Sequence, residues 1–441
     1  MNRYLFRRGI APRLALIGFA CVGQLCLSQA GLANSPLPPP ASAAPQTANA
    51  TGLTLEQAVR LALENQPQLA RLAARVHEAG EMATAEGELP DPKLTVGLNS
   101  LPVDTFSFTQ EEMTQAMIGI SQMIPGGNKR RLSSQRMRVE AGRMSAELEM
   151  ARRRIARDAA LAWLNLYYPS QALLLLERIG QEYERELDWS AVALASGEMS
   201  QADTLAVRVM RAYVQDQVAD MRREASRAQA ELARWVRPTA GELRAEGPLP
   251  QKPATTGALD EHPELATLRA GVAVAQADAA LAREAYKPDW GVDVGYGLRG
   301  GGRTDMISVA VGVELPLFTA RRQDRRLAAR LAAVDGAENE LEDRRRELAA
   351  GLAGAQADWQ AAEQRVRLFE ETLIPLAQRR IDSTLALYRG GKGAFSMVLE
   401  ARRAELEARM QLLRQQVEQA RAAVALRYFL NDGPAVPAAE R

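Results

Sequence analysis

The chain has 441 residues, of which 47% are hydrophobic, 25% charged and 5% aromatic, and its 55 Lys and Arg residues nearly balance its 54 Asp and Glu residues. The formal net charge of +1 argues against nucleic acid as a partner, because a nucleic-acid-binding face needs a basic excess. Two Cys and two His residues exclude a disulfide framework and a zinc or haem site built from the chain's own side chains. We therefore expect no metal site and no cofactor.

The first 33 residues are predicted to form a cleavable export signal. Basic residues precede an apolar stretch at 14–27, and Gly31-Leu32-Ala33 supplies the small-residue pattern for cleavage after Ala33. A membrane anchor is the alternative, but the stretch is shorter than the roughly 20 apolar residues that span a bilayer. Lipidation of Cys21, which follows a weak lipoprotein motif, is a further alternative. Residues 34–52 predict a Pro/Ala-rich tether that does not fold alone.

The remaining chain contains the same pattern twice. Pro67 and Pro92 recur as Pro263 and Pro288, and other shared features recur at a similar offset of about 190 residues. This offset is far longer than a solenoid repeat and indicates duplication of a large unit. We predict a first repeat, a linker, a second repeat and a C-terminal tail at 53–236, 237–257, 258–432 and 433–441.

Most of each repeat has helical periodicity. Thr54 and Gln57 form a capping-box start for a helical stretch at 53–87. Longer stretches at 127–196 and 321–389 would each form a rod of roughly 100 Å at 1.5 Å per residue. Abundant Ala predicts close helix contacts, and the dense Arg/Glu pattern predicts a solvated outer face, as in a long coiled-coil-like assembly. A simple elongated coiled coil is the alternative.

In four segments apolar and polar residues alternate with a period of two, as they do in strands with lipid on one side and water on the other. They lie near 93–100, 114–123, 289–298 and 306–315, and a proline stands at each junction with the helices. The predicted lipid-facing residues are Ile118, Ile120, Val292, Val294, Val309 and Val311. Two hairpins of a soluble sheet are the alternative. Four strands cannot close a membrane barrel, whereas three copies would supply 12.

Several motifs resemble the TolC-like outer-membrane efflux family, over about residues 53–432. They are the NQPQL and EHPEL sequences at 65–69 and 261–265, QMIPGGNKRR at 122–131, and the turns that follow Gly197 and Gly391. Within the family, LPDPKL at 89–94 and SLPVD at 100–104 are similar to the heavy-metal branch, which serves cobalt/zinc/cadmium or copper/silver pumps.

The resemblance implies a mainly α fold with a small membrane β-barrel portion. A homotrimer would combine four transmembrane strands per chain into a 12-stranded barrel in the lipid of the Gram-negative outer membrane. The duplicated long helices would form an α-barrel through the periplasm. The channel would be the exit duct of a tripartite efflux pump, with a periplasmic adaptor (membrane fusion) protein and a proton-driven inner-membrane RND-type pump as partners, and heavy-metal cations as its cargo.

The resemblance also implies a gate at the periplasmic tip, near Gly197 and Gly391. Tyr388 and Gly391 match a family Y-x-x-G motif, and Glu400 matches one of the family's acids, but Met397 stands where another acid is common. In the first repeat Asp203 occupies the slot equivalent to Met397, so three copies could line a cation-attracting constriction.

No residue pattern predicts an enzyme. The GYGLRG sequence at 295–300 matches a dinucleotide-loop motif, but it leads into another strand, whereas such a loop must open a helix. His77 and His262 have no second ligand at helical spacing, and we expect both on helix surfaces. No nucleophile–base pair or phosphate loop is present in the sequence.

Three other functions stay open. A multidrug efflux or type I secretion duct of the same fold is the nearest, because a wide duct carries little information about its cargo. A periplasmic helical scaffold or adaptor without its own barrel would lack lipid-facing strands. A self-contained porin would need more strands than the four found here.

Overall fold

The computed structural model describes residues 52–197, 199–237, 243–253 and 259–430. The predicted export signal at 1–33, Cys21, the tether up to residue 51 and the tail from 433 lie outside the described residues.

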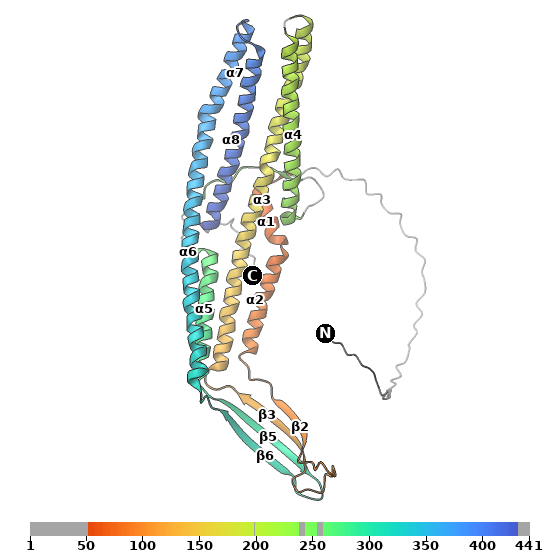
Figure 1. Ribbon diagram of the computed structural model, residues 1–441, viewed down its shortest axis with the longest axis vertical. Coiled ribbons are helices and arrows are strands. Elements are labelled where there is room, and N and C mark those ends of the chain that lie inside the picture. Colours follow the sequence, from red (N-terminus) through yellow and green to blue (C-terminus); the bar gives the residue numbers. More distant parts are fainter. Residues whose placement is uncertain (1–51, 198, 238–242, 254–258, 431–441) are drawn as a thin grey trace, which may run out of the picture. The chain divides into compact units, whose positions relative to one another are not determined.

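Helices and strands follow one another in the same order in both halves of the described chain (Figure 1). The first half contains α1 (Leu55–Asn65), α2 (Pro67–Ala85), β2 (Lys93–Asn99), β3 (Gln115–Ile124), α3 (Lys129–Ala195) and α4 (Gln201–Val236). The second half contains α5 (Pro263–Glu284), β5 (Asp289–Arg299), β6 (Met306–Glu314), α6 (Gln323–Leu368), α7 (Ile374–Arg389) and α8 (Phe395–Phe429). The four strands form one sheet at one end of the helices, and the α3–α4 and α7–α8 turns lie at the other end.

The two long helical stretches differ in their continuity. α3 runs for 67 residues without a break, although Pro169 lies inside it. The expected counterpart at 321–389 is instead divided into α6 and α7 by a π-helical turn, Phe369–Leu373. Pro375 follows this turn, and a proline ring removes one helical hydrogen bond and crowds the preceding turn. A widened turn gives the backbone the room that the ring needs.

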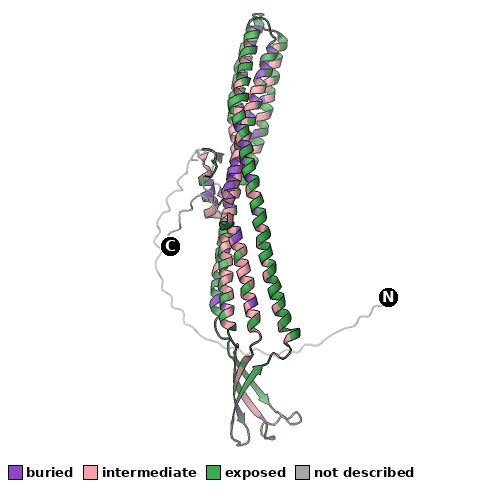
Figure 2. Ribbon diagram, turned by 90° about the vertical axis from the view of Figure 1, so that its left-hand side faces the viewer, coloured by how far each residue is buried: buried purple, intermediate pink, exposed green. Residues whose placement is uncertain are grey.

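The helical core consists of two main clusters, one near the middle of the helices and one toward the turns. Trp163 and Leu164 of α3 are fully buried in the first, where α1, α4 and α8 pack around them. Leu176, Val207 and Val398 are fully buried in the second. Buried residues therefore concentrate along α3, α4 and α8, whereas much of α6 and of the sheet is exposed in the single chain (Figure 2).

A pair of very short strands lies where no periodic pattern could predict it. β1 (Gly52–Leu53) pairs in parallel with β4 (Arg244–Ala245), so Gly52 of the expected tether and part of the expected linker are ordered. Trp163 Nε1 donates a hydrogen bond to the Leu53 carbonyl oxygen at 2.7 Å. Leu53 and Ala245 thereby enter the middle core and fix both segments to α3.

The expectation of a surface position is wrong for His262, which is 1% exposed. His262 is the N-cap of α5, where its Nδ1 accepts a hydrogen bond from the Glu264 backbone N–H at 3.2 Å. Its Nε2 then carries the proton and donates to the Tyr428 carbonyl oxygen at 3.1 Å. The contact with α8 is 166 residues away in sequence, so helical spacing could not reveal it. His77 is exposed, as expected, and lies beside Glu81.

The burial of His262 should make the stability of the fold depend on pH. Burial lowers the pKa of His262 below the ordinary value of 6.5. The unfolded chain takes up a proton near pH 6.5 that the folded chain resists, so the free energy of unfolding should fall as pH drops below about 6.5. His262→Asn keeps a helix-capping side chain and removes this titration. The thermal midpoint of the variant, followed by circular dichroism from pH 7.5 to 5.5, should fall less than that of the wild type. Parallel pH profiles would contradict this assignment.

Candidate functional site

The four-stranded sheet combines both halves of the chain. Its order is β2-β3-β5-β6, and all neighbouring pairs are antiparallel. β3 and β5 pair over ten residues, from Gln115 opposite Arg299 to Ile124 opposite Trp290. β2 and β6 therefore form the two edges of the sheet, and their outer hydrogen-bonding groups have no strand partner among the described residues.

The register places the predicted apolar residues on a common face. Residues directly opposite in antiparallel strands point to the same side of the sheet. Ile120, Val294 and Val309 form one such row, and Ile118, Tyr296 and Ile307 form the next. Val292 and Val311 are paired in a third row. All six predicted lipid-facing residues thus share one face, and Val309 and Val311 are 67% and 61% exposed in the single chain.

One polar residue, Gln122, interrupts the apolar face. It stands opposite Val292, near the helical end of β3. Its side-chain amide donates to the Pro90 and Met123 carbonyl oxygens at 2.8 and 2.9 Å, so its polar group is satisfied locally. Placing a side-chain amide on an apolar face costs less free energy when its polar atoms are hydrogen-bonded within the protein, near the edge of that face, than when they are unpaired in its middle.

The opposite face is made of glycine, polar and charged residues, together with methionines. A Cβ at Gly295 would lie 3.1 Å from the Met117 methyl group, and one at Gly297 would overlap the Gln115 amide. The β5 glycines therefore make room for long side chains of β3. The GYGLRG sequence lies in β5 and the following turn and opens no helix, so it cannot present a helix N-terminus to a phosphate.

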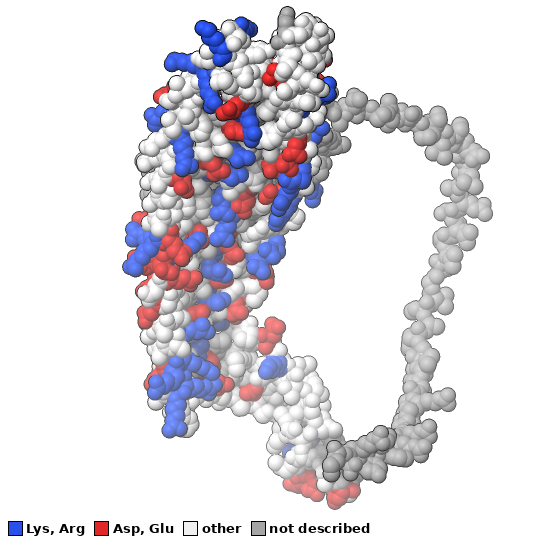
Figure 3. All heavy atoms as spheres, turned by 45° about the horizontal axis from the view of Figure 1, so that its top comes forward, with Lys and Arg blue, Asp and Glu red and all other residues white. Residues whose placement is uncertain are grey.

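Acidic residues gather at the far end of the sheet, in the β2–β3 and β5–β6 connections (Figure 3). They are Asp104, Glu111, Glu112 and Asp305. The two connections are bonded to each other, because Arg303 donates to the Thr109 carbonyl oxygen at 3.1 Å and Arg299 donates to that of Glu112. The sheet itself carries few charged groups in this view.

The residues predicted for the gate lie at and beside two helical turns. Gly197 follows α3 with φ +78°, and Gly391 follows α7 with φ +68°, both in the left-handed region that favours glycine. Each turn reverses the chain into the next helix, α4 or α8. The structure thus brings the two turns to the same end of the helices, opposite the sheet.

Side chains near the turns have different electrostatic surroundings. The Asp203 carboxylate accepts a hydrogen bond from the Ser200 hydroxyl at 2.6 Å, and no Lys or Arg of the described chain forms an ion pair with it. Glu400 is paired with Arg380 at 3.0 Å. The Tyr388 ring packs 5.0 Å from the Phe395 ring, between centroids. Asp203 therefore has no ion-pair partner among the described residues and is held at the N-terminus of α4 by Ser200, whereas Glu400 is paired with Arg380.

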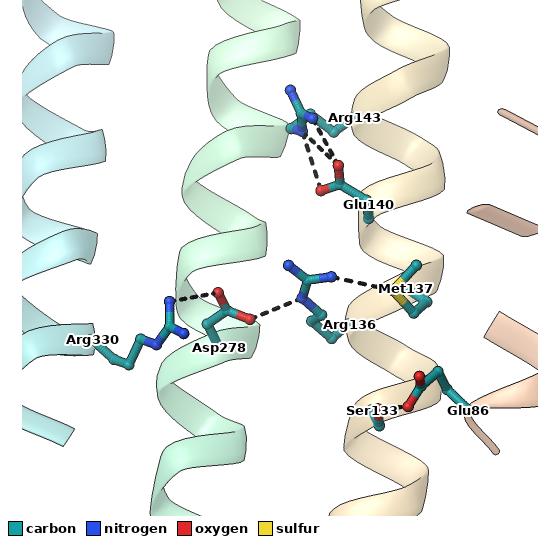
Figure 4. Close-up of polar contacts among 8 residues, drawn as sticks. All are labelled: Glu86, Ser133, Arg136, Met137, Glu140, Arg143, Asp278 and Arg330. Atoms are coloured by element: carbon teal, nitrogen blue, oxygen red, sulfur yellow. Dashed lines mark hydrogen bonds and ion pairs between the residues drawn. The ribbon is translucent and has the colours of Figure 1, made fainter. Parts of the chain in front are cut away.

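Part of the Arg/Glu pattern lies between helices, contrary to the expectation of a purely solvated outer face. Asp278 of α5 accepts from Arg136 of α3 at 2.9 Å and from Arg330 of α6 at 3.2 Å (Figure 4). Glu264, whose side chain is 11% exposed, is paired with Arg154 and Arg344 at 3.3 and 2.8 Å. These carboxylates link α5 to both neighbouring long helices.

The described residues contain no group of three or more His, Cys, Asp or Glu side chains arranged to hold a metal ion. Among the described helices, α5 has the length and apolar composition to cross a membrane, which for one helix is weak evidence. α5 also carries Glu264 and Asp278, each paired with two arginines. The structure therefore places membrane-compatible apolar surface on the sheet rather than on an isolated helix.

Comparison with known proteins identifies relatives over nearly the whole chain. Residues 256–432 match the family model described as outer membrane efflux protein. The cobalt-zinc-cadmium resistance protein CzcC of Cupriavidus metallidurans is 24% identical over 425 residues, which cover 94% of this chain and 96% of that protein.

Solved structures share the fold. The channel CusC superposes with a TM-score of 0.72 at 16% identity, covering 85% of this chain and 91% of CusC. The outer membrane protein VceC of Vibrio cholerae superposes with a TM-score of 0.70 at 17% identity, covering 85% of this chain and 95% of VceC. The chain therefore shares the fold of these outer-membrane channels, and its second half matches the outer membrane efflux protein family.

Proposed function

We propose that this chain is the exit duct of a tripartite, proton-driven efflux pump, in which three copies close one 12-stranded barrel in the outer membrane. The observation that carries the proposal is a sheet with one face that is apolar apart from Gln122, and with two edges that have no strand partner among the described residues. Unpaired backbone groups cost several kcal/mol each in lipid, so a membrane sheet must close on itself. Three chains of four strands give a barrel of ordinary size, and their long helices would continue it as a periplasmic α-barrel.

The apolar face is the side that we assign to lipid. β3, β5 and β6 have 10, 11 and 9 residues, close to the roughly 9–11 of a tilted membrane strand. The face with Gly, Ser, Asn and Asp would line the water-filled lumen. A periplasmic scaffold without a barrel has no use for an apolar sheet face, and a self-contained porin would need more strands than the described residues supply.

We assign heavy-metal cations as the cargo, and a periplasmic adaptor and an inner-membrane RND-type pump as the partners. CzcC, which matches 94% of this chain, is a cobalt-zinc-cadmium resistance protein. The family serves as outer-membrane ducts, so the metal chemistry of pumping would reside in the partner pump. A multidrug or type I secretion duct remains the second candidate, because the same fold suits either cargo.

The turn end of the helices is our candidate for the periplasmic gate. Gly197 and Gly391 permit the two reversals, and the Tyr388–Phe395 contact packs the second turn. In a trimer, three Asp203 carboxylates without an ion-pair partner among the described residues would form one ring and would favour cations at the constriction. Glu400 would contribute less, because Arg380 balances it.

The assignment of the two sheet faces predicts opposite outcomes at adjacent residues of β6. Val309→Arg should destabilise membrane insertion by about 2–4 kcal/mol, since arginine would face the lipid near the bilayer midplane. Ser308→Arg would face the lumen and should assemble normally. The measurement is the yield of heat-modifiable trimer in outer-membrane fractions. A defect in Ser308→Arg alone would show that the faces are reversed, and equal yields would contradict the assignment of one face to lipid.

The gate predicts a change in ion selectivity. Asp203→Asn keeps the size and the hydrogen-bond acceptor but removes one charge per chain, so cation selectivity should fall. The reversal potential of the purified channel in planar bilayers under a KCl gradient should shift toward zero. Glu400→Gln is the matched control and should produce a smaller shift. A larger shift for Glu400→Gln would reject the proposed role of Asp203.

The assignment of heavy-metal cations as cargo predicts a selective growth defect in a strain that lacks the protein. A host strain without the protein should lose tolerance to one or more of Zn²⁺, Co²⁺, Cd²⁺, Cu⁺ and Ag⁺ while keeping its tolerance to dyes and antibiotics. Growth inhibition curves measure both sets. Loss of drug tolerance alone would support a multidrug duct and contradict the assignment of metal cations as cargo. No change in tolerance to either set of compounds would contradict an efflux role under those conditions.

A further inference from the structure

The four helices next to the sheet follow the order of its strands and, like the sheet, have two open edges. α2, α3, α5 and α6 are neighbours in that order, as β2, β3, β5 and β6 are (Figure 1). α2 leads into edge strand β2, and α6 follows edge strand β6. One flank of α2 and one flank of the sheet half of α6 therefore have no helix packed along them in the described part of the chain, and much of α6 is exposed (Figure 2).

α2 turns its buried side toward α3. Leu72, Ala79 and Ala83 are buried, and the Ala83 carbonyl oxygen accepts a hydrogen bond from the Ser134 hydroxyl of α3 at 2.6 Å. At about 100° per residue, the opposite side of α2 holds exposed residues at steps of four and three. They are Ala70, Ala74, His77 and Glu81. We call this side the open flank of α2, and its spacing is that of a helix packed along another helix.

The sheet half of α6 has the same plan. Its partly or fully buried side repeats every seven residues, at Leu327, Val334, Leu341 and Leu348. The opposite side, the open flank of α6, again holds exposed residues at steps of three and four. They are Ala329, Ala332, Gly336, Asn339 and Asp343. Small residues let two helix axes approach closely, so the open flanks of α2 and α6 both suit a contact with a helix.

Charge changes sign along each edge, in opposite senses. On α2 and its connection to β2, residues 78–91 contain five acids and no Lys or Arg, whereas residues 68–77 contain two arginines and no acid. At the start of α6, residues 319–330 contain five arginines and one acid, whereas residues 332–343 contain five acids and no Lys or Arg. In the direction away from the sheet, the α2 edge therefore changes from acidic to basic, and the α6 edge changes from basic to acidic.

The two changes of sign lie at similar heights along the helices. Ser134 of α3 contacts Ala83 of α2, and Arg136, two residues further along α3, shares a carboxylate with Arg330 of α6. Away from the sheet, the charge changes sign within eight residues of Ala83 on α2 and within five residues of Arg330 on α6. At about 1.5 Å per residue, the two changes lie within about two turns of each other. Rotation about an axis along the helices preserves height, so a neighbouring copy would bring acids beside arginines in both blocks.

The arginines at the start of α6 need acids from outside their own chain. Of the five, Arg330 alone has an ion-pair partner among the described residues, which is Asp278. The one acid in this block, Asp324, accepts a hydrogen bond from the Tyr286 hydroxyl at 2.6 Å. Basic side chains at the start of a helix are unfavourable, because the positive end of the helix dipole lies there. Acids of a neighbouring α2 would offset this cost.

We propose that the open flank of α6 packs against the open flank of α2 in a second copy of this chain, as a seam of small residues bordered by two complementary charge blocks. The seam rests on the proposed barrel, and it specifies the helix faces that close the assembly. It continues the contact that the β6 edge would make with the β2 edge of the next copy. Two α6 flanks, or two α2 flanks, side by side in the same direction would oppose like charges in both blocks, so the charges select the α6–α2 contact.

Disulfide formation between introduced cysteines tests the seam. Both native cysteines lie within residues 1–33, the predicted export signal, so the processed protein contains no other thiol. Three double variants combine Ala74→Cys with Ala332→Cys, Gly336→Cys or Asn339→Cys, which are successive positions of the α6 flank. At least one of them should give covalent dimers and trimers on non-reducing gels of outer-membrane fractions, since disulfides need Cα atoms within about 7 Å.

The matched controls combine Ala74→Cys with Leu331→Cys or Glu338→Cys, which lie at similar heights on another side of α6. They should stay uncross-linked, as should Ala74→Cys alone. Cross-links in the controls only, or in no variant although heat-modifiable trimers form, would overturn the seam and leave the duct standing. A helix of another protein would then be the better occupant of these flanks. Covalent dimers without trimers would support the seam and contradict the 12-stranded barrel.

Charge reversal tests the two blocks independently of cysteine geometry. Arg325→Glu/Arg326→Glu should lower the temperature at which the trimer dissociates in detergent, and Glu81→Arg/Glu88→Arg should do the same, because each change opposes like charges. The variant with all four changes should recover most of the lost thermal stability, which a local folding defect in either helix would not allow. Failure of the combined variant to recover would overturn the pairing of these blocks.

Discussion

The register between β3 and β5 is the constraint on which both faces of the sheet depend. The two strands come from different halves of the chain, and they join the two hairpins into one sheet. Because side chains alternate along a strand, a slip by one residue would place Ser121 opposite Val294, or Asp293 opposite Ile120, depending on its direction. The glycines of β5 reinforce the register, since Met117 and Gln115 occupy the space above them. The shared apolar face and the glycine-rich opposite face both follow from this one alignment.

The helical part is organised by a different interaction, the pairing of mostly buried carboxylates with arginines on neighbouring helices. α5 is held between α3 and α6 through Asp278 and Glu264, each shared by two arginines. Near the turns, Glu186 of α3 and Arg402 of α8 are 2.7 Å apart and connect the two halves. Burial raises the pKa of Glu186, and the Arg402 charge opposes that shift. Such pairs fix which helices are neighbours more than they add stability, because desolvation offsets much of their attraction.

Much of the fold could be predicted from the sequence, because the decisive signals are local. The capping box at Thr54 is confirmed by reciprocal hydrogen bonds with Gln57, and alternation located the strands to within a few residues. Contacts between distant segments could not be predicted. The buried position of His262 depends on Tyr428, and the two-residue pairing of β1 with β4 is too short for any period to appear. The break between α6 and α7 next to Pro375 could have been expected, since a proline inside a helix removes one backbone hydrogen bond. Pro169, which lies inside the unbroken α3, shows that a helix can also continue past a proline. At the candidate site, the turn glycines were visible in the sequence, whereas the ion pair of Glu400 with Arg380 needed the arrangement of the helices, and the pairing of β3 with β5 needed the register of the strands.

The two edges of the sheet differ in origin, because β2 belongs to the first half of the chain and β6 to the second. Pairing β2 with β2 of another copy in antiparallel fashion would require a twofold axis through the sheet, which would send the helices of the two copies to opposite sides of the membrane. β6 of one copy can instead meet β2 of the next with the alternation of strand direction preserved. In the proposed barrel this contact would be head-to-tail, and such contacts generate rings. An assembly closed in this way would present the helices of every subunit to the same compartment.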